Sequence, residues 1–435
     1  MSFRPFILGI VALAAVFFLG KTFAQAQVPP DVAAWKDPQN AEAVPEWARR
    51  LLNSLNSRDF REIASTSRGE LLTKTLSALK EIAADSHVVP STRINAILTA
   101  GQLVSGEPGN PLVAYPDALP YLIEVYQQPD TPHYLQCGAL LGIVRHANNG
   151  IDPARKDEVI DLLLETVITE FGSEGNPLDP APLEPEAWDW FRHAALDGLA
   201  GLTTVGTNGK VVAELLGVIN YKSQELENLC RNQEMFTRRE WEQSRRAAEL
   251  ASKAAKTLGD LNYSSVTDLD AANMTDTFIR LTRAICDINS KMAADSIEKG
   301  GTSPNPTLLL EQIVINVKMG TQSVVWGIRS SFLVSRSAND SFYTSLESND
   351  PAVKRLDTLL AEIMKLAAFL DEGNGTRRPI LSANLPREFQ FNLSELRDAL
   401  AKTSEAITEK QYEEEIEDEV HSPVEPAIIP AKAGT

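Results

Sequence analysis

The sequence contains five histidines, the residues best suited to acid–base chemistry at neutral pH and to metal binding. None is followed by glutamate, and no two have the four-residue spacing that places a pair of zinc ligands on one helical face. His133, His146 and His193 lie on neighbouring predicted helices, where stacking can bring them together. A joint metal site and separate surface or capping roles both remain open for these three. We assign no metal ligand and no cofactor.

The segment from Gly201 to Lys210, GLTTVGTNGK, is only superficially similar to a phosphate-binding loop. After Gly206 come Thr207 and Asn208, where that loop requires lysine and then serine or threonine. We interpret the segment as a turn between two helices. No G-x-S-x-G elbow and no paired-cysteine zinc pattern occurs either. These observations favour a non-catalytic protein, and we assign no catalytic residue.

Three cysteines are present, so one disulfide at most can form within the chain. Cys137 lies in the small-residue part of a predicted helix, and we expect a buried thiol there. Cys230 and Cys286 can pair only if their helices pack together. The sequence leaves that pairing open.

The helix predicted from Glu186 to Leu202 carries the candidate recognition residues. Its apolar stripe consists of Trp188, Phe191, Ala195, Leu199 and Leu202. A step of two residues rotates a side chain by about 200°, so Trp190, His193 and Asp197 point elsewhere. Aromatic anchors dominate the energetics of interfaces, and we predict a partner-binding patch at these three residues. The alternative is that Trp190 packs under the preceding insertion, GSEGNPLDPAPLEP.

One pattern, which we call the frame, recurs in this part of the chain. It consists of a long polar residue, an alanine three positions later, and then small residues. Its first residues are Arg93, Gln136 and Arg192, which recur at an interval of about 40 residues once the insertion before Arg192 is allowed for. An amphipathic run precedes each frame. The three runs are LLTKTLSALKEIA from Leu71, ALPYLIEVY from Ala118 and DEVIDLLLETVI from Asp157.

The segments TRINAILTAGQL, LQCGALLGIV and FRHAALDGLAGL resemble the second helix of HEAT repeats, and the preceding runs resemble the first helix. The resemblance implies a curved stack of helix pairs, and such stacks usually bind other macromolecules along one face. It also has a limit: the HEAT hydroxylases take their iron ligands from His-Glu dipeptides, which this chain lacks. An irregular all-α domain of ordinary amphipathic helices is the alternative.

Beyond Tyr221 the pattern changes to longer helices with apolar residues at alternating steps of three and four. Four such seams, separated by glycine, asparagine and proline clusters, predict an antiparallel helical bundle. Further degenerate repeat units are the alternative. The seams are Trp241, Ser244, Ala248, Ala251, Ala255 and Leu258; Met274, Phe278, Leu281, Ile285, Ile288 and Met292; Leu310, Ile313, Val317, Val324, Ile328 and Phe332; and Val353, Leu356, Leu360, Ile363, Ala367 and Leu370.

The first residues predict export. An uncharged apolar run from Phe6 to Leu19 follows Arg4 and precedes the small-residue triplet that ends at Ala26. The run is shorter than the roughly 20 residues that span a bilayer, so we predict a signal peptide cleaved after Ala26. An uncleaved anchor is the alternative, and no cysteine follows to suggest a lipoprotein. We therefore expect a secreted or periplasmic protein whose mature chain is not inserted in a membrane.

The net charge limits the partners. Removing Arg4 and Lys21 with the signal peptide changes the formal charge from −18 by two units, to −20. Such a surface repels phosphate backbones and anionic head groups, which disfavours nucleic acid and membrane binding. Basic proteins, polycations and divalent ions remain as partner classes. The C-terminal cluster of Glu413, Glu414, Glu415, Glu417, Asp418 and Glu419 predicts a disordered acidic tail, either a lure for cations or simply a solvated end.

The patterns together predict an all-α protein with a HEAT-like α-solenoid followed by an antiparallel bundle. Its expected parts are a signal peptide (1–26), an extended lead-in and first helix (27–58), HEAT-like repeats (59–220), the bundle (221–410) and the disordered tail (411–435). We expect a non-catalytic scaffold for protein–protein interaction. A hydrolase or lyase with a site between solenoid and bundle, and a structural component of the cell envelope, are the alternatives.

Overall fold

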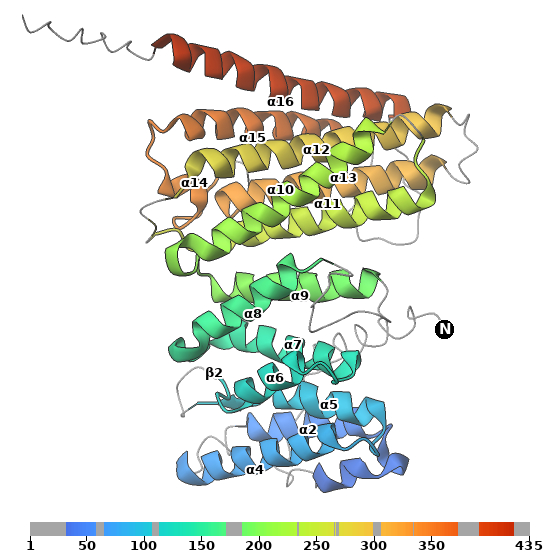
Figure 1. The fold of residues 1–435 in the computed structure, drawn as a ribbon, viewed down its shortest axis with the longest axis vertical. Helices are drawn as coiled ribbons and strands as arrows, with labels where there is room; N and C mark the ends of the chain where they lie inside the picture. The colour runs from blue at the N-terminus through green and yellow to red at the C-terminus, as the bar shows by residue number, and fades with distance from the viewer. Residues whose placement is uncertain are drawn as a thin grey trace, which may run out of the picture. The chain divides into compact units, whose positions relative to one another are not determined.

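The chain is all-α (Figure 1). The computed structural model describes residues 32–57, 65–106, 113–170, 185–232, 235–264, 266, 269–298, 306–333, 335–372 and 391–421. Within these ranges there are 14 α-helices and one two-stranded antiparallel sheet, in which Val104 pairs with Ala114. None of the helices in these ranges is both long and apolar enough to cross a bilayer.

The chain divides into two compact units, Met1–Thr203 and Thr204–Thr435. The division precedes helix α10 (Lys210–Arg231), whereas the sequence prediction placed the change of pattern at residue 221, inside that helix. Thr203, the last residue of the first unit, has a positive φ of 48°. Leu202 ends the preceding helix, α9 (Pro185–Leu202), so the helical backbone stops just before the division.

The first unit is built from helices that follow one another along the chain (Figure 1). α5 (Pro90–Ala100) packs on α4 (Ser65–Ala84), α7 (His133–Asn149) on α6 (Ala118–Gln127), and α9 on α8 (Lys156–Ile168). α7 also contacts both α5 and α9. The remaining elements are the 3₁₀ helices η1 (Val32–Lys36), η2 (Pro38–Asn40) and η3 (Pro153–Arg155), helix α2 (Val44–Leu55), and strands β1 (Val104–Ser105) and β2 (Val113–Ala114).

Small residues permit the close approach of helices in this unit. A Cβ atom placed on Gly101 would lie 2.5 Å from the Cα atom of Gly142 on α7. A Cβ atom on Gly198 would lie 2.8 Å from Leu163. These distances are far inside van der Waals contact, so the backbone of each glycine lies directly against its neighbour. Ala195 lies on α9 together with Gly198 and is fully buried, as the spacing predicted.

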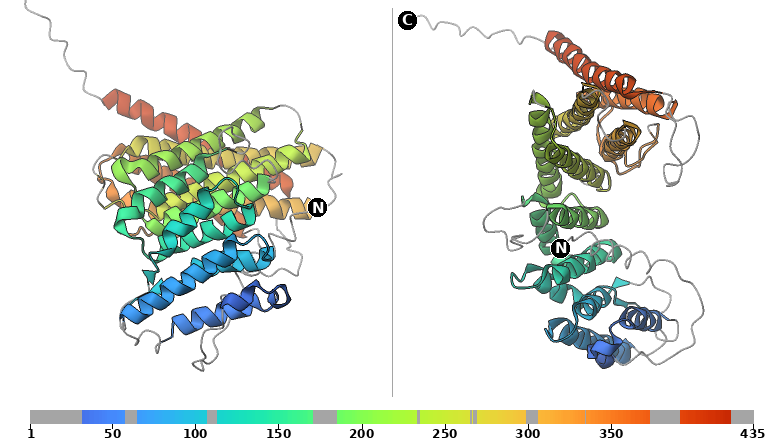
Figure 2. Two further views of the ribbon diagram at one scale, coloured as in Figure 1. Left: turned by 60° about the horizontal axis from the view of Figure 1, so that its bottom comes forward. Right: turned by 90° about the vertical axis from the view of Figure 1, so that its right-hand side faces the viewer.

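The second unit consists of longer helices, seen from further directions in Figure 2. α12 (Ala271–Glu298) contacts α10, α11 (Arg238–Gly259), α13 (Pro306–Arg329), α15 (Pro351–Glu372) and α16 (Leu393–His421). α11 in turn packs against α10 and α13. The short elements are η4 (Thr207–Gly209) and α14 (Phe342–Ser345).

The predicted seams are largely buried. Every member of the seam on α12 is at most 3% exposed. Phe332 is the exception in the seam on α13, because that helix ends at Arg329 and the Phe332 side chain is 51% exposed. Its ring lies instead against Trp326, with centroids 4.5 Å apart. Four further seam members are half-buried: Trp241, Ala248, Val353 and Ala367.

Residues 411–421, which the sequence analysis assigned to a disordered tail, continue α16 to His421. Glutamate is a good helix former, and the acidic cluster directly follows a helix that already packs on α12 and α15. Residues 422–435 lie outside the described residues, as does the predicted signal peptide.

Candidate functional site

The helix α9 places its predicted inner and outer residues as expected. Trp188, Phe191 and Ala195 are at most 4% exposed. Trp190 is half-buried, with its ring edge-on to Phe191 at 5.4 Å between centroids. His193 is also half-buried and Asp197 is exposed. The three candidate recognition residues therefore lie on the less buried side of α9, and most of the insertion before this helix lies outside the described residues.

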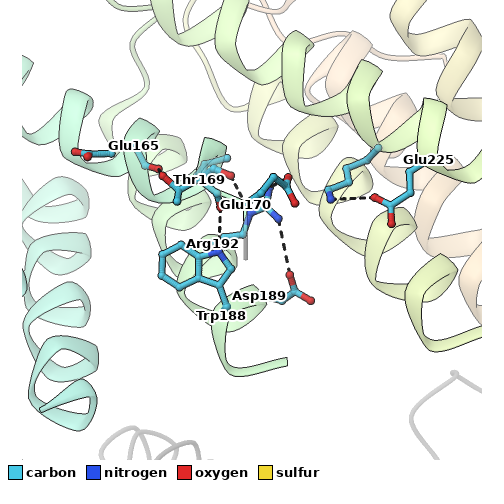
Figure 3. A network of polar contacts seen from close by, with 9 residues as sticks. Glu165, Thr169, Glu170, Trp188, Asp189, Arg192 and Glu225 are labelled. Atoms are coloured by element: carbon cyan, nitrogen blue, oxygen red, sulfur yellow. Dashed lines mark hydrogen bonds and ion pairs between the residues drawn. The ribbon is translucent and has the colours of Figure 1, made fainter. Parts of the chain in front are cut away.

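Arg192 lies between these residues in the sequence but is buried, at 2% exposure. Arg192 is drawn beside Trp188 and Glu170 in Figure 3. Its Nε atom donates a 2.8 Å hydrogen bond to the carbonyl oxygen of Val167, near the end of α8. Its Nη2 atom donates to the Glu170 carboxylate at 3.1 Å. Beside it, the indole Nε1 of Trp188 donates to the carbonyl oxygen of Thr169 at 3.0 Å. α9 therefore supplies the donors that the last carbonyl groups of α8 lack within their own helix.

The same arrangement recurs at Arg93, the equivalent position on α5. The Nε atom of Arg93 donates a 2.8 Å hydrogen bond to the carbonyl oxygen of Ala83, near the end of α4. Its Nη1 atom donates to the hydroxyl of Tyr134 at 3.1 Å.

Gln136 does the same on α7. Its Nε2 atom donates to the carbonyl oxygens of Tyr126 at 3.3 Å and Gln128 at 3.4 Å, at the end of α6. The Nδ1 atom of His133 lies 2.9 Å from Oε1 of Gln136, so this histidine helps to orient the amide. The first residue of the repeated frame is thus a side-chain cap for the preceding helix in all three pairs. The recurrence of a donor-bearing residue on an apolar face was the signal for this role, which the sequence reasoning missed.

The second unit contains an open cavity of about 920 Å³, which we call the acidic cavity. Its walls come from the end of α10, the turn before α11, one face of α12 and one face of α16. Among the described side chains that line it, the carboxylates are those of Asp287, Asp295, Glu298, Glu405 and Glu409, and the ammonium group is that of Lys291. Sequence reasoning missed this site, because carboxylates on two helices that are distant in the sequence do not reveal a shared cavity.

Burial determines the electrostatics of the acidic cavity. It raises the pKa of Asp287, although a hydrogen bond from Ser404 and the nearby charge of Arg283 act in the opposite direction. Burial also raises the pKa of the Cys230 thiol to about 12, with a further contribution from Asp287. Cys230 is therefore a thiol rather than a nucleophilic thiolate at neutral pH.

All three cysteines are free, so the disulfide between Cys230 and Cys286 that the sequence left open is not formed, even though α10 and α12 pack together. Cys137 is buried as predicted, and burial raises the pKa of its thiol to about 12. His146 is buried on α7 and does not join the other histidines at a metal site. Throughout the described ranges, no three histidine, cysteine, aspartate or glutamate side chains are grouped closely enough to hold a metal ion.

Comparison with known proteins gave no match: neither a protein family, nor a curated protein, nor a solved structure is significantly similar to this chain.

Proposed function

We propose that the protein is an exported, non-catalytic scaffold whose first unit is a HEAT-like solenoid that binds another protein. The observation that carries this proposal is the shared cap: Arg93, Gln136 and Arg192 each bind the end of the preceding helix in successive helix pairs. Because the same kind of side-chain cap joins the two helices of each pair, successive pairs have similar geometry. Stacks of such pairs present a continuous surface, which solenoid proteins use to bind macromolecules.

The partner surface that we propose includes Trp190, His193 and Asp197 on α9. The half-buried ring of Trp190 retains surface for a partner, and the exposed Asp197 lies two helical turns further on. Aromatic rings combined with neighbouring polar groups are typical of the residues that dominate binding energies. The acidity of the chain favours a partner that carries basic groups.

The experiment is quantitative affinity capture from cell-envelope extract and culture fluid with the mature chain as bait, beginning at Gln27. We expect Trp190→Ala to reduce recovery of a stoichiometric partner about tenfold or more. Trp47→Ala is the matched control, because Trp47 is another half-buried tryptophan in the first unit. Unchanged capture by Trp190→Ala, together with a lower melting temperature, would assign this tryptophan to packing alone.

Export has its own measurement. Mass spectrometry of the exported protein should give a chain that starts at Gln27, with the apolar run from Phe6 to Leu19 removed. A mature form that retains this run would contradict the cleaved signal peptide and support the uncleaved anchor.

A further inference from the structure

Helix α13 is apolar on two opposite sides. One side holds the predicted seam and is buried, with Ile313, Val317 and Val324 all at 0% exposure. On the opposite side, Met319 is 57% exposed and Leu308 is 60% exposed. A surface helix of a globular protein has charged and polar residues on its outer side. The apolar residues on the outer side of α13 therefore indicate a surface that another molecule covers.

The outer side of α13 carries residues with heptad spacing, which we call the outer stripe. Its members recur at alternating steps of four and three residues, so they share one helical face. They are Leu308, Gln312, Ile315, Met319, Gln322 and Trp326. Leu308, Met319 and Gln322 are exposed, and the other three are half-buried. This spacing is typical of a helix that packs along its length against another helix.

The outer stripe is uncharged, although the chain is strongly acidic. From Gln312 to Asn339 the sequence contains no aspartate or glutamate, whereas the whole chain has 59 of them among 435 residues. The one charged residue between Gln312 and Trp326 is Lys318, which is 9% exposed and forms an ion pair with Asp371 on α15. A net charge of −18 makes two copies of the chain repel each other. A second copy can approach the outer stripe with less repulsion than it meets at an acidic surface.

The order of residue types in the outer stripe is the same from both ends. Inward from either end there is a large apolar residue, then a glutamine, then a second large apolar residue, and the three pairs share Val317 as their midpoint. A two-fold axis at Val317, perpendicular to α13, would set Gln312 of one copy against Gln322 of the other, and Ile315 against Met319. Amides would then meet amides, and apolar side chains would meet apolar side chains. Only an antiparallel pair needs this symmetric order, because a parallel pair places identical residues together whatever their order.

We propose that the outer stripe of α13 is the contact between two copies of this chain, which pack antiparallel about a two-fold axis at Val317. Ile315 and Met319 form the apolar centre of the contact. Gln312 and Gln322 fix the alignment of the two helices, because a shift along the helix would bury an amide without a partner. The contact belongs to the second unit alone and does not depend on the proposed partner surface of α9.

The first test is sedimentation velocity of the mature chain at concentrations up to about 100 µM. We expect a reversible monomer–dimer equilibrium for the unaltered chain. Met319→Glu should raise the dissociation constant about tenfold or more, since it would bury a carboxylate against Ile315 of the other copy. Met235→Glu is the matched control and should leave the equilibrium unchanged. Met235 is also an exposed methionine, but it lines the acidic cavity, whose described lining contains no residue of α13.

Two double variants test the antiparallel alignment. Gln312→Glu with Gln322→Lys should keep the dimer, because an antiparallel pair sets each introduced carboxylate against an ammonium group of the other copy. A parallel pair would set like charges together. Gln312→Glu with Gln322→Glu should raise the dissociation constant about tenfold or more, because both of its contacts then place two carboxylates together.

Three results would overturn the proposal: a monomer at every concentration, equal dimerisation of Met319→Glu and Met235→Glu, or loss of the dimer in the variant with Gln312→Glu and Gln322→Lys. The first removes the second copy as the occupant, the second moves the contact away from the outer stripe, and the third excludes the antiparallel alignment. Circular dichroism of every variant checks that its helices are intact.

Discussion

His146 shows how the fold determines the protonation of a single side chain. The imidazole lies on α7 at 1% exposure, and its Nε2 atom has no hydrogen-bond partner in the described structure. Burial, with a smaller contribution from the adjacent charge of Arg145, lowers the pKa of His146 to about 4. The folded protein therefore keeps this residue neutral at neutral pH, and an unfolded chain would accept a proton from pH 6.5 downward.

This difference predicts a loss of stability in acid. The stabilising contribution of neutral His146 is fully present above pH 6.5 and is lost as the pH falls toward 4. We expect the free energy of unfolding to fall by about 3 kcal/mol over that interval from this residue alone. Urea unfolding across the interval should show a smaller loss for His146→Leu. His87→Leu, which removes an exposed histidine, should show the same loss as the unaltered chain.

At the scale of the element, the caps of the first unit explain why one frame position accepts both arginine and glutamine. The carbonyl groups at the end of a helix need donors, and a guanidinium and an amide both carry N–H groups. Arg192 and Gln136 satisfy this need on α9 and α7. The repeat therefore conserves a bonding role within the chain and not a residue type.

Substitution of Arg192 tests the cap. Arg192→Leu leaves the Val167 carbonyl oxygen without its donor, and we expect a loss of about 1 to 3 kcal/mol in the free energy of unfolding. Arg192→Gln should cost less, since Gln136 performs the same task on α7. Thermal and urea unfolding measure both variants. Equal losses for leucine and glutamine would mean that packing and charge matter here and the hydrogen bond does not.

The glycine contact between α5 and α7 is a second property of the elements. Gly101→Ala would force its Cβ atom into the backbone of Gly142, so we expect a loss of about 1 to 3 kcal/mol. Gly217→Ala on α10 is the contrasting control: its added Cβ meets nothing within 4 Å, and alanine should stabilise the helix by about 0.5 to 1 kcal/mol. Calorimetric melting of both variants checks the opposite signs. A neutral Gly101→Ala would show that the helices separate freely.

At the scale of the whole molecule, each unit has a core of its own. Trp188 is buried within the first unit, and Phe278 and Phe342 are buried within the second. We expect a fragment of residues 32–203 and one of residues 204–421 each to give a helical circular dichroism spectrum and a cooperative urea transition. A fragment that remains unfolded while its counterpart folds would show that the two units depend on each other for stability.

The sequence by itself determined the helices, their buried faces and the recurrence in the first half. These depend on local spacing, because three- and four-residue steps on one helix decide which side chains share a face. The inward position of Phe191 and the burial of the seam on α12 followed from that rule. The exposed Phe332 did not, since the end of α13 at Arg329 depends on the turn that follows and not on the seam.

Only the tertiary structure decided what residues on different helices do together. The capping role of Arg192 requires the end of α8 to lie beside α9, and the acidic cavity requires Glu405 on α16 to face the same space as Asp287 on α12. The free thiols of Cys230 and Cys286 are a further case. Periodicity specifies a face, but the residue across from that face is set by packing between segments that are distant in the chain.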